Sequence, residues 1–229
     1  MKKLLLILLC LPMIGFGQGW EKIIDNNDDD VGYSVQQTTD GGYIMGGRTK
    51  GMPSAGWLQA EAWLIKTDDQ GIVEWINDTY NSGNSSTIHS VQQTLDGGYI
   101  AAGCLFGTSL NPNGQQQSVN DDVWLIKTNS LGDTLWTKLY KTEYNTIDRA
   151  FSVQQTLDGG YIMSGTSSNE IWLIKTDFQG DEIWNTLLGP GQGTYVQQTS
   201  DGGYIVAGTT GSDAILIKTN SLGDTLWTK

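Results

Sequence analysis

One phrase occurs four times in this chain and limits its fold more than any other feature. The copies read SVQQTTDGGYI from Ser34, SVQQTLDGGYI from Ser90 and from Ser152, and YVQQTSDGGYI from Tyr195. A second phrase follows each copy and reads WLIKTDDQGIVEW, WLIKTNSLGDTLW, WLIKTDFQGDEIW or ILIKTNSLGDTLW. Such periodic self-similarity is typical of repeat architectures, in which neighbouring copies bury each other's apolar faces.

Each copy holds four short segments rich in β-branched and aromatic residues, with turn signals between them and no helical period. Two joints keep the same length in every copy. Asp-Gly-Gly supplies the positive φ of a tight hairpin turn. The second joint combines an Asx turn with a left-handed glycine. Two hairpins in series predict a four-stranded antiparallel meander, which is a propeller blade with VQQT innermost and the closing tryptophan strand outermost.

The sequence therefore predicts an all-β fold, a β-propeller with four visible blades near residues 34–75, 90–136, 152–184 and 195–227. We expect an incomplete or irregularly closed ring. A fifth segment of the closing type, Gly19 to Ile24, precedes the first copy, and four complete blades leave it surplus. The blades are accordingly expected to continue in a longer chain.

The first 17 residues have the layout of a secretory signal peptide, because Lys2 and Lys3 precede an apolar run from Leu4 to Ile14 that ends in small residues. Residues 18–229 then form the propeller domain. No later stretch approaches the roughly 20 apolar residues of a membrane-spanning helix, so no membrane insertion is expected. We expect a secreted protein, extracellular or on the cell surface, with the periplasm as the alternative.

Charge excludes nucleic acid as a partner, and cysteine content excludes an internal disulfide. The net charge of −12 becomes −14 when the two lysines of the signal peptide are removed, and such an acidic surface repels nucleic acid. Cys104 is the only cysteine of the mature domain, so an internal disulfide is excluded. We interpret its side chain as a small, half-buried hydrophobe.

The phrase DGGYIMGG with its partner AWLIKTDDQGIVEW, repeated in three sister copies, resembles the repeats of secreted bacterial β-propeller proteins of the SBBP type. Such repeats are often found in exported proteins with a C-terminal type IX sorting domain. The resemblance implies an extracellular propeller and no particular reaction. A weaker likeness, to quinoprotein propellers, rests on D-x-x-G-x-x-x-W at Asp68 to Trp75 and Asp177 to Trp184. We interpret that pattern as a tryptophan docking between adjacent blades.

The polar groups that recur in every copy are interpreted as structural. The glutamine pairs are expected to bond to neighbouring blades or to water rather than to a ligand. The repeated lysines and the DGG aspartates form one structural element per blade, because a catalytic group is not needed four times. The lysines are Lys66, Lys127, Lys175 and Lys218.

No catalytic residue and no metal site is assigned. His89 is the only histidine, which excludes a multi-histidine zinc site, and we interpret it as a solvated loop residue. The acidic stretch Asp25 to Gly32 could supply oxygen ligands to calcium, although a solvated acidic loop between blades is favoured. No other cofactor is expected.

All length variation falls on one set of connections. Between the second and third strands these hold 15, 20, 6 and 6 residues, and the two long ones, Arg48 to Ala62 and Cys104 to Val123, belong to adjacent blades. Loops on a rigid scaffold accumulate binding groups, so we expect a carbohydrate or a protein or peptide ligand there. The candidate binding residues are Arg48, Trp57 and Phe106 on these loops and Tyr80 and Tyr144 on the neighbouring inter-blade loops.

Two function classes follow. The first is an exported, non-enzymatic propeller that serves as a binding or scaffold module, with its ligand on the long-loop face. The alternative is a propeller enzyme that acts on extracellular glycans as a glycoside hydrolase or lyase. Two or three carboxylates converging at the mouth of the channel would mark the second class.

Overall fold

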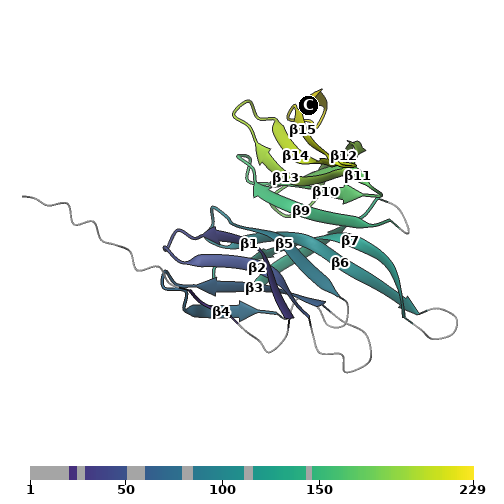
Figure 1. Ribbon diagram of the computed structural model, residues 1–229. Helices are drawn as coiled ribbons and strands as arrows, with labels where there is room; N and C mark the ends of the chain where they lie inside the picture. Colours follow the sequence, from purple (N-terminus) through teal and green to yellow (C-terminus); the bar gives the residue numbers. More distant parts are fainter. Residues whose placement is uncertain (1–20, 25–28, 51–59, 79–84, 111–115, 143–145) are drawn as a thin grey trace, which may run out of the picture.

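The computed structural model describes residues 21–24, 29–50, 60–78, 85–110, 116–142 and 146–229, and Figure 1 shows its arrangement. These residues form sixteen strands and no helix. Blade 1 contains β1 (Asp29–Gln37), β2 (Tyr43–Lys50), β3 (Ala60–Thr67) and β4 (Val73–Asn77). Blade 2 contains β5 (Ser86–Gln93), β6 (Tyr99–Leu110), β7 (Gln116–Thr128) and β8 (Thr134–Tyr140).

Blade 3 contains β9 (Asp148–Gln155), β10 (Tyr161–Ser167), β11 (Glu170–Thr176) and β12 (Glu182–Pro190). Blade 4 contains β13 (Gln192–Gln198), β14 (Tyr204–Thr210), β15 (Asp213–Thr219) and β16 (Thr225–Thr228). Every sheet has four strands in chain order. The four sheets form an arc with blades 1 and 4 at its ends (Figure 1). The predicted all-β, propeller-like arrangement of blades is therefore confirmed.

The innermost strands β1, β5, β9 and β13 surround a common channel. A cavity between them is lined by the Ser-Val-Gln residues of β1, β5 and β9 and by Tyr195 and Val196 of β13. The phrase VQQT thus lies innermost, as predicted. The second long connection differs from the expected loop, because Tyr99–Leu110 and Gln116–Thr128 pair as an extended hairpin that covers most of it.

The DGG turns fold around their aspartate. In blade 1, Gly41 adopts a φ of 90° and its N–H donates to the Thr38 carbonyl at 2.9 Å. The Asp40 carboxylate accepts a hydrogen bond from the Thr38 hydroxyl and another, at 3.0 Å, from Gly42 N–H. It also pairs with Lys66 Nζ at 2.9 Å. The same set of contacts recurs in the other three blades.

The repeated lysines are structural, as expected. The side chains of Lys66, Lys127 and Lys175 are nearly inaccessible to solvent. Each Nζ donates to the carbonyl of the next residue and to the DGG aspartate of its own blade. Each buried ammonium therefore joins the third strand to the first turn of the blade.

These turns predict an acid-sensitive fold. Hydrogen bonds from Thr38 and Lys66 lower the pKa of Asp40 from 3.8 to about 2. The pKa values of Asp96 and Asp158 are also lowered, although partial burial acts in the opposite direction. A carboxylate with a lowered folded-state pKa stabilises the fold above its unfolded-state pKa and loses that effect as the pH falls through the folded value. Urea denaturation should therefore give a smaller unfolding free energy at about pH 2.5 than at about pH 5. Equal values would contradict this account.

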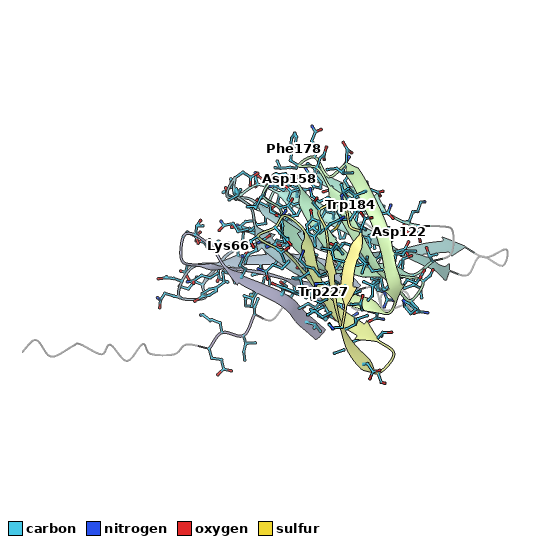
Figure 2. All side chains as sticks on the ribbon, turned by 90° about the horizontal axis from the view of Figure 1, so that it is seen from above. Lys66, Asp122, Asp158, Phe178, Trp184 and Trp227 are labelled. Carbon is cyan, nitrogen blue, oxygen red and sulfur yellow. The ribbon has the colours of Figure 1, made fainter. Side chains whose placement is uncertain are left out.

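The closing tryptophans dock on the following blade, as the sequence pattern indicated. Trp75 lies 5.7 Å from Tyr99 between ring centroids and against Gly132, where a Cβ would come within 2.9 Å of its ring. Trp136 and Trp184 make the matching contacts with the next blades. Trp227, in blade 4, is 42% exposed (Figure 2).

A polar zipper joins the innermost strands. Ser34 Oγ accepts a hydrogen bond from Val91 N–H at 3.1 Å, and Gln36 Oε1 accepts one from Gln93 N–H at 2.6 Å. In return, Gln93 Oε1 accepts one from Thr39 N–H at 2.8 Å. The backbone edge of an innermost strand has no strand partner, so side chains of the preceding blade satisfy its donors. The expected inter-blade role of the glutamines is confirmed, and equivalent bonds join blades 2 and 3 and blades 3 and 4.

Candidate functional site

Each innermost strand contains a β-bulge just before the zipper. The ladder pairing shifts by one residue at Tyr33, His89, Phe151 and Thr194, which occupy the same place in blades 1 to 4. A bulge leaves one residue outside the ladder and re-aims its side chain. The bulge residues lie towards the long-loop end of the channel, since the tight DGG turns are at the other end of the same strands.

A glycine opposite each bulge makes room for it. A Cβ on Gly165 would lie 1.8 Å from the Arg149 carbonyl oxygen, and one on Gly103 would lie 1.8 Å from the Thr87 oxygen. Gly47 and Gly208 stand in the same relation to their neighbours, with distances of 2.1 Å. No L-residue with a side chain fits there without a backbone shift. The glycine that ends each Y-I-x-x-G segment therefore permits the bulge.

The bulge residues of blades 1 to 3 form an aromatic row, which we define as Tyr33, His89 and Phe151. The centroids of Tyr33 and His89 are 5.3 Å apart at an interplanar angle of 68°, and those of His89 and Phe151 are 5.2 Å apart at 52°. The first contact is edge-to-face and the second is tilted, and such arrangements stabilise aromatic pairs. The row thus runs across blades 1, 2 and 3, at the long-loop end of their innermost strands.

The interpretation of His89 as a solvated loop residue is wrong. It lies in β5 and is half-buried, and its Nδ1–H donates to the Ala150 carbonyl at 2.9 Å. Burial lowers the pKa of His89, and the nearby Arg149 and Arg48 act in the same direction. The ring is therefore neutral at physiological pH and serves as the middle member of the aromatic row.

Two guanidinium groups flank the aromatic row. Arg48 lies over the Tyr33 ring, with its Cζ 6.0 Å from the centroid, and the described residues place no carboxylate within ion-pair distance of it. Arg149 lies over Phe106 at 5.6 Å. It also pairs with the buried Asp121 through Nη2 and through Nε at 2.6 Å. Arg149 is thus held in place by an ion pair, whereas the described residues give Arg48 only its contact with the Tyr33 ring.

The structure brings together some of the predicted site residues. Arg48 lies over Tyr33 of the aromatic row, and Phe106 lies under Arg149. Trp57, Tyr80 and Tyr144 lie outside the described residues. Tyr33, Phe151 and Arg149 were not predicted as site residues, and His89 was predicted only as a solvated loop residue. A signal was present, since the residue before each (S/Y)VQQ phrase differs between otherwise similar copies and reads Tyr33, His89, Phe151 and Thr194.

Cys104 is more deeply buried than expected. Its side chain is 0% exposed rather than half-exposed, and burial raises the pKa of its thiol to about 12. A thiol with so high a pKa carries almost no thiolate at neutral pH and is a poor nucleophile. Cys104 therefore supports the wall behind the site by packing.

Two buried carboxylates at the long-loop end, Asp121 and Asp148, are engaged in structural contacts. Besides Asp121, the fully buried Asp148 accepts hydrogen bonds from Thr142 N–H at 3.0 Å and from the Thr146 hydroxyl at 3.0 Å. No carboxylate of the described residues lines the cavity between the innermost strands.

The acidic stretch Asp25 to Gly32 is only partly a loop. Residues 25–28 lie outside the described part of the chain, and Asp29 to Gly32 belong to strand β1 rather than to an inter-blade loop. The described residues contain no group of three or more His, Cys, Asp or Glu side chains that could hold a metal ion. They also contain no helix long and apolar enough to cross a membrane.

The comparisons with known proteins bear on the fold. No family model matches the chain, and no curated protein matches it. Among solved structures, it is similar to the crystal structure of a protein of unknown function from Dyadobacter fermentans DSM 18053, with a TM-score of 0.58. The two share 13% identity over 89% of this chain and 70% of that chain. At that identity the likeness concerns the fold alone, and with the four blades it defines a propeller-like repeat protein.

Proposed function

We propose that this protein is an exported, non-enzymatic binding module that takes a carbohydrate at the long-loop mouth of its channel. The observation that carries the proposal is the aromatic row with the Arg48 guanidinium beside it, which has no ion-pair partner among the described residues. Aromatic faces pack against the apolar face of a sugar ring, and a few polar groups then fix its orientation. Export rests on the signal-peptide pattern of the first 17 residues.

The variation between repeats supports a binding role for these positions. The zipper and turn residues are almost the same in all blades, whereas the bulge positions hold Tyr, His, Phe and Thr. A bulge residue has no ladder partner, so its side chain can change while the strand pairing is kept. The free charge of Arg48 favours a sugar with a carboxylate or sulfate group, because a guanidinium pairs well with planar oxyanions.

The test compares binding to a glycan array that includes uronic-acid and sulfated sugars. Tyr33→Ala and Arg48→Gln should each weaken binding about tenfold, the effect of losing one aromatic or one charge-assisted contact. Phe178→Ala is the matched control, because this aromatic residue, labelled in Figure 2, is 66% exposed in the turn between β11 and β12, on the face of the tight turns and not of the long connections. Unchanged binding by the first two variants would place the site elsewhere. Binding to peptides and to no glycan would contradict the carbohydrate class.

A further inference from the structure

One ring nitrogen of His89 is fixed by the fold, and the other is left for a ligand. Nδ1 lies 2.9 Å from the Ala150 carbonyl oxygen. A carbonyl oxygen only accepts hydrogen bonds, so Nδ1 carries a proton. In a neutral imidazole the second nitrogen, Nε2, is then a bare acceptor. The bond to Ala150 therefore sets both the tautomer and the orientation of the ring.

The described residues supply no donor to Nε2. The hydrogen bond that they give the His89 side chain is the one from Nδ1. Nε2 is also not one of the fully buried polar atoms that lack a partner, so it is accessible from solvent. A half-buried acceptor of this kind is available to a ligand.

The surroundings of the ring keep Nε2 unprotonated. The pKa of His89 lies below its usual value, mainly because of burial, although the bond to Ala150 acts in the opposite direction. Arg149 of β9 and Arg48 of β2 lower this pKa further, because a guanidinium repels a second proton on the ring. At neutral pH the aromatic row thus holds an acceptor between two cations.

This combination restricts the chemistry of the ligand. Arg48 and His89 both contact the ring of Tyr33, at 6.0 Å and 5.3 Å from its centroid, so they can meet two groups of one sugar. An ion that has acceptors only, such as inorganic sulfate, satisfies the guanidinium and leaves Nε2 without a partner. A cationic donor is repelled by Arg48 and Arg149. The site therefore favours an anionic group and a neutral donor on the same molecule.

We infer that His89 selects the ligand of this site by accepting a hydrogen bond at Nε2 from a sugar hydroxyl, while Arg48 binds the carboxylate of the same sugar. The substrate class is accordingly a uronic acid with free hydroxyls, because it carries both groups on one ring. A site that hydrogen-bonds a hydroxyl discriminates against analogues that lack it. This inference rests on the proposed function, since it concerns the same site.

NMR of the imidazole nitrogens tests the inference directly, because His89 is the only histidine of the chain. In the free protein at neutral pH, Nδ1 should be protonated and Nε2 bare. On titration with methyl β-glucuronide, the Nε2 resonance should move towards that of a hydrogen-bonded nitrogen, while the Nδ1 resonance stays in place. A protonated Nε2 in the free protein, or an Nε2 resonance that does not move at saturation, would overturn the inference.

The matched variant is His89→Phe, because Phe151 holds the same place in blade 3. It keeps an aromatic ring in the row and removes both nitrogens. Wild-type protein should bind one monodeoxy analogue of methyl β-glucuronide about tenfold more weakly than the parent sugar. His89→Phe should bind the parent about tenfold more weakly than wild type and should not distinguish it from that analogue. If the analogue loses as much affinity for His89→Phe as for wild type, the hydroxyl is bound by another group and the inference is wrong.

Failure of the proposed function gives a different result. Wild-type protein that binds neither the glucuronide nor any other acidic sugar would contradict both the proposed site and the role of His89. If Tyr33→Ala and Arg48→Gln weaken binding of the glucuronide while His89→Phe does not, the site stands and only the role of His89 is overturned. Circular dichroism checks that all variants keep the fold.

Discussion

Replacing Gly165 by alanine is expected to lower the free energy of unfolding by about 3 kcal/mol or more, because the new Cβ meets a backbone atom that cannot move aside. It would lie 1.8 Å from the Arg149 carbonyl oxygen and 2.8 Å from the carbonyl carbon. The clash can be relieved only by straightening the bulge at Phe151. Guanidinium denaturation followed by tryptophan fluorescence measures the loss.

The control for this variant is Gly159→Ala in the same blade. Gly159 has a φ of 84° and nothing within 4 Å of an added Cβ, so its substitution brings backbone strain without a clash. Strain of that kind costs about 1 to 2 kcal/mol. If Gly165→Ala destabilises the protein no more than Gly159→Ala, the close approach opposite the bulge is not what the glycine provides.

Removing the carboxylate of Asp158 should have the second-largest effect, a loss of about 2 to 3 kcal/mol. Asp158→Ala leaves the ammonium of Lys175, which is 3% exposed, without its counter-ion, and it also removes acceptors from the Thr156 hydroxyl and Gly160 N–H. The expected loss is below that of a fully buried pair, because the Asp158 side chain is 58% exposed and water screens it.

A double variant separates charge from packing. In Asp158→Ala with Lys175→Met, no buried charge remains, so most of the lost stability should return. Thermal and chemical denaturation of the single and double variants give the two values. A double variant as unstable as Asp158→Ala would mean that the hydrogen bonds of the turn, and not the stranded ammonium, account for the loss.

The blades were predictable because their determinants are local. The glycine at each turn and the Asx residue before it define the two hairpins, and the spacing of these signals is constant in all copies. The inter-blade roles of the tryptophans and glutamines also followed, since groups repeated once per blade are expected to meet at equivalent interfaces.

The site was less predictable, because it depends on register and on contacts between blades. His89 resembles a loop residue in the sequence, and only the pairing of β5 with β6 identifies it as a bulge. The extended hairpin over Tyr99–Leu110 and Gln116–Thr128 was missed because its segment contains the amide-rich NPNGQQQ, which lacks strand alternation. Arg48 and Phe106 were identified because they lie on the two long connections between the second and third strands, where binding groups are expected.

The β-bulge separates two requirements of a repeat protein: the blades must be alike in order to pack together, and the binding residues must differ from blade to blade. Ladder and zipper residues must stay alike for each blade to fit the next, whereas the bulge side chain takes part in neither. When such a blade is duplicated, each new copy therefore carries one position, the bulge, that tolerates substitution. These positions are arranged around a common axis. Binding specificity can then evolve blade by blade, through single substitutions at the bulge positions, while the strand pairing and the contacts between blades stay the same.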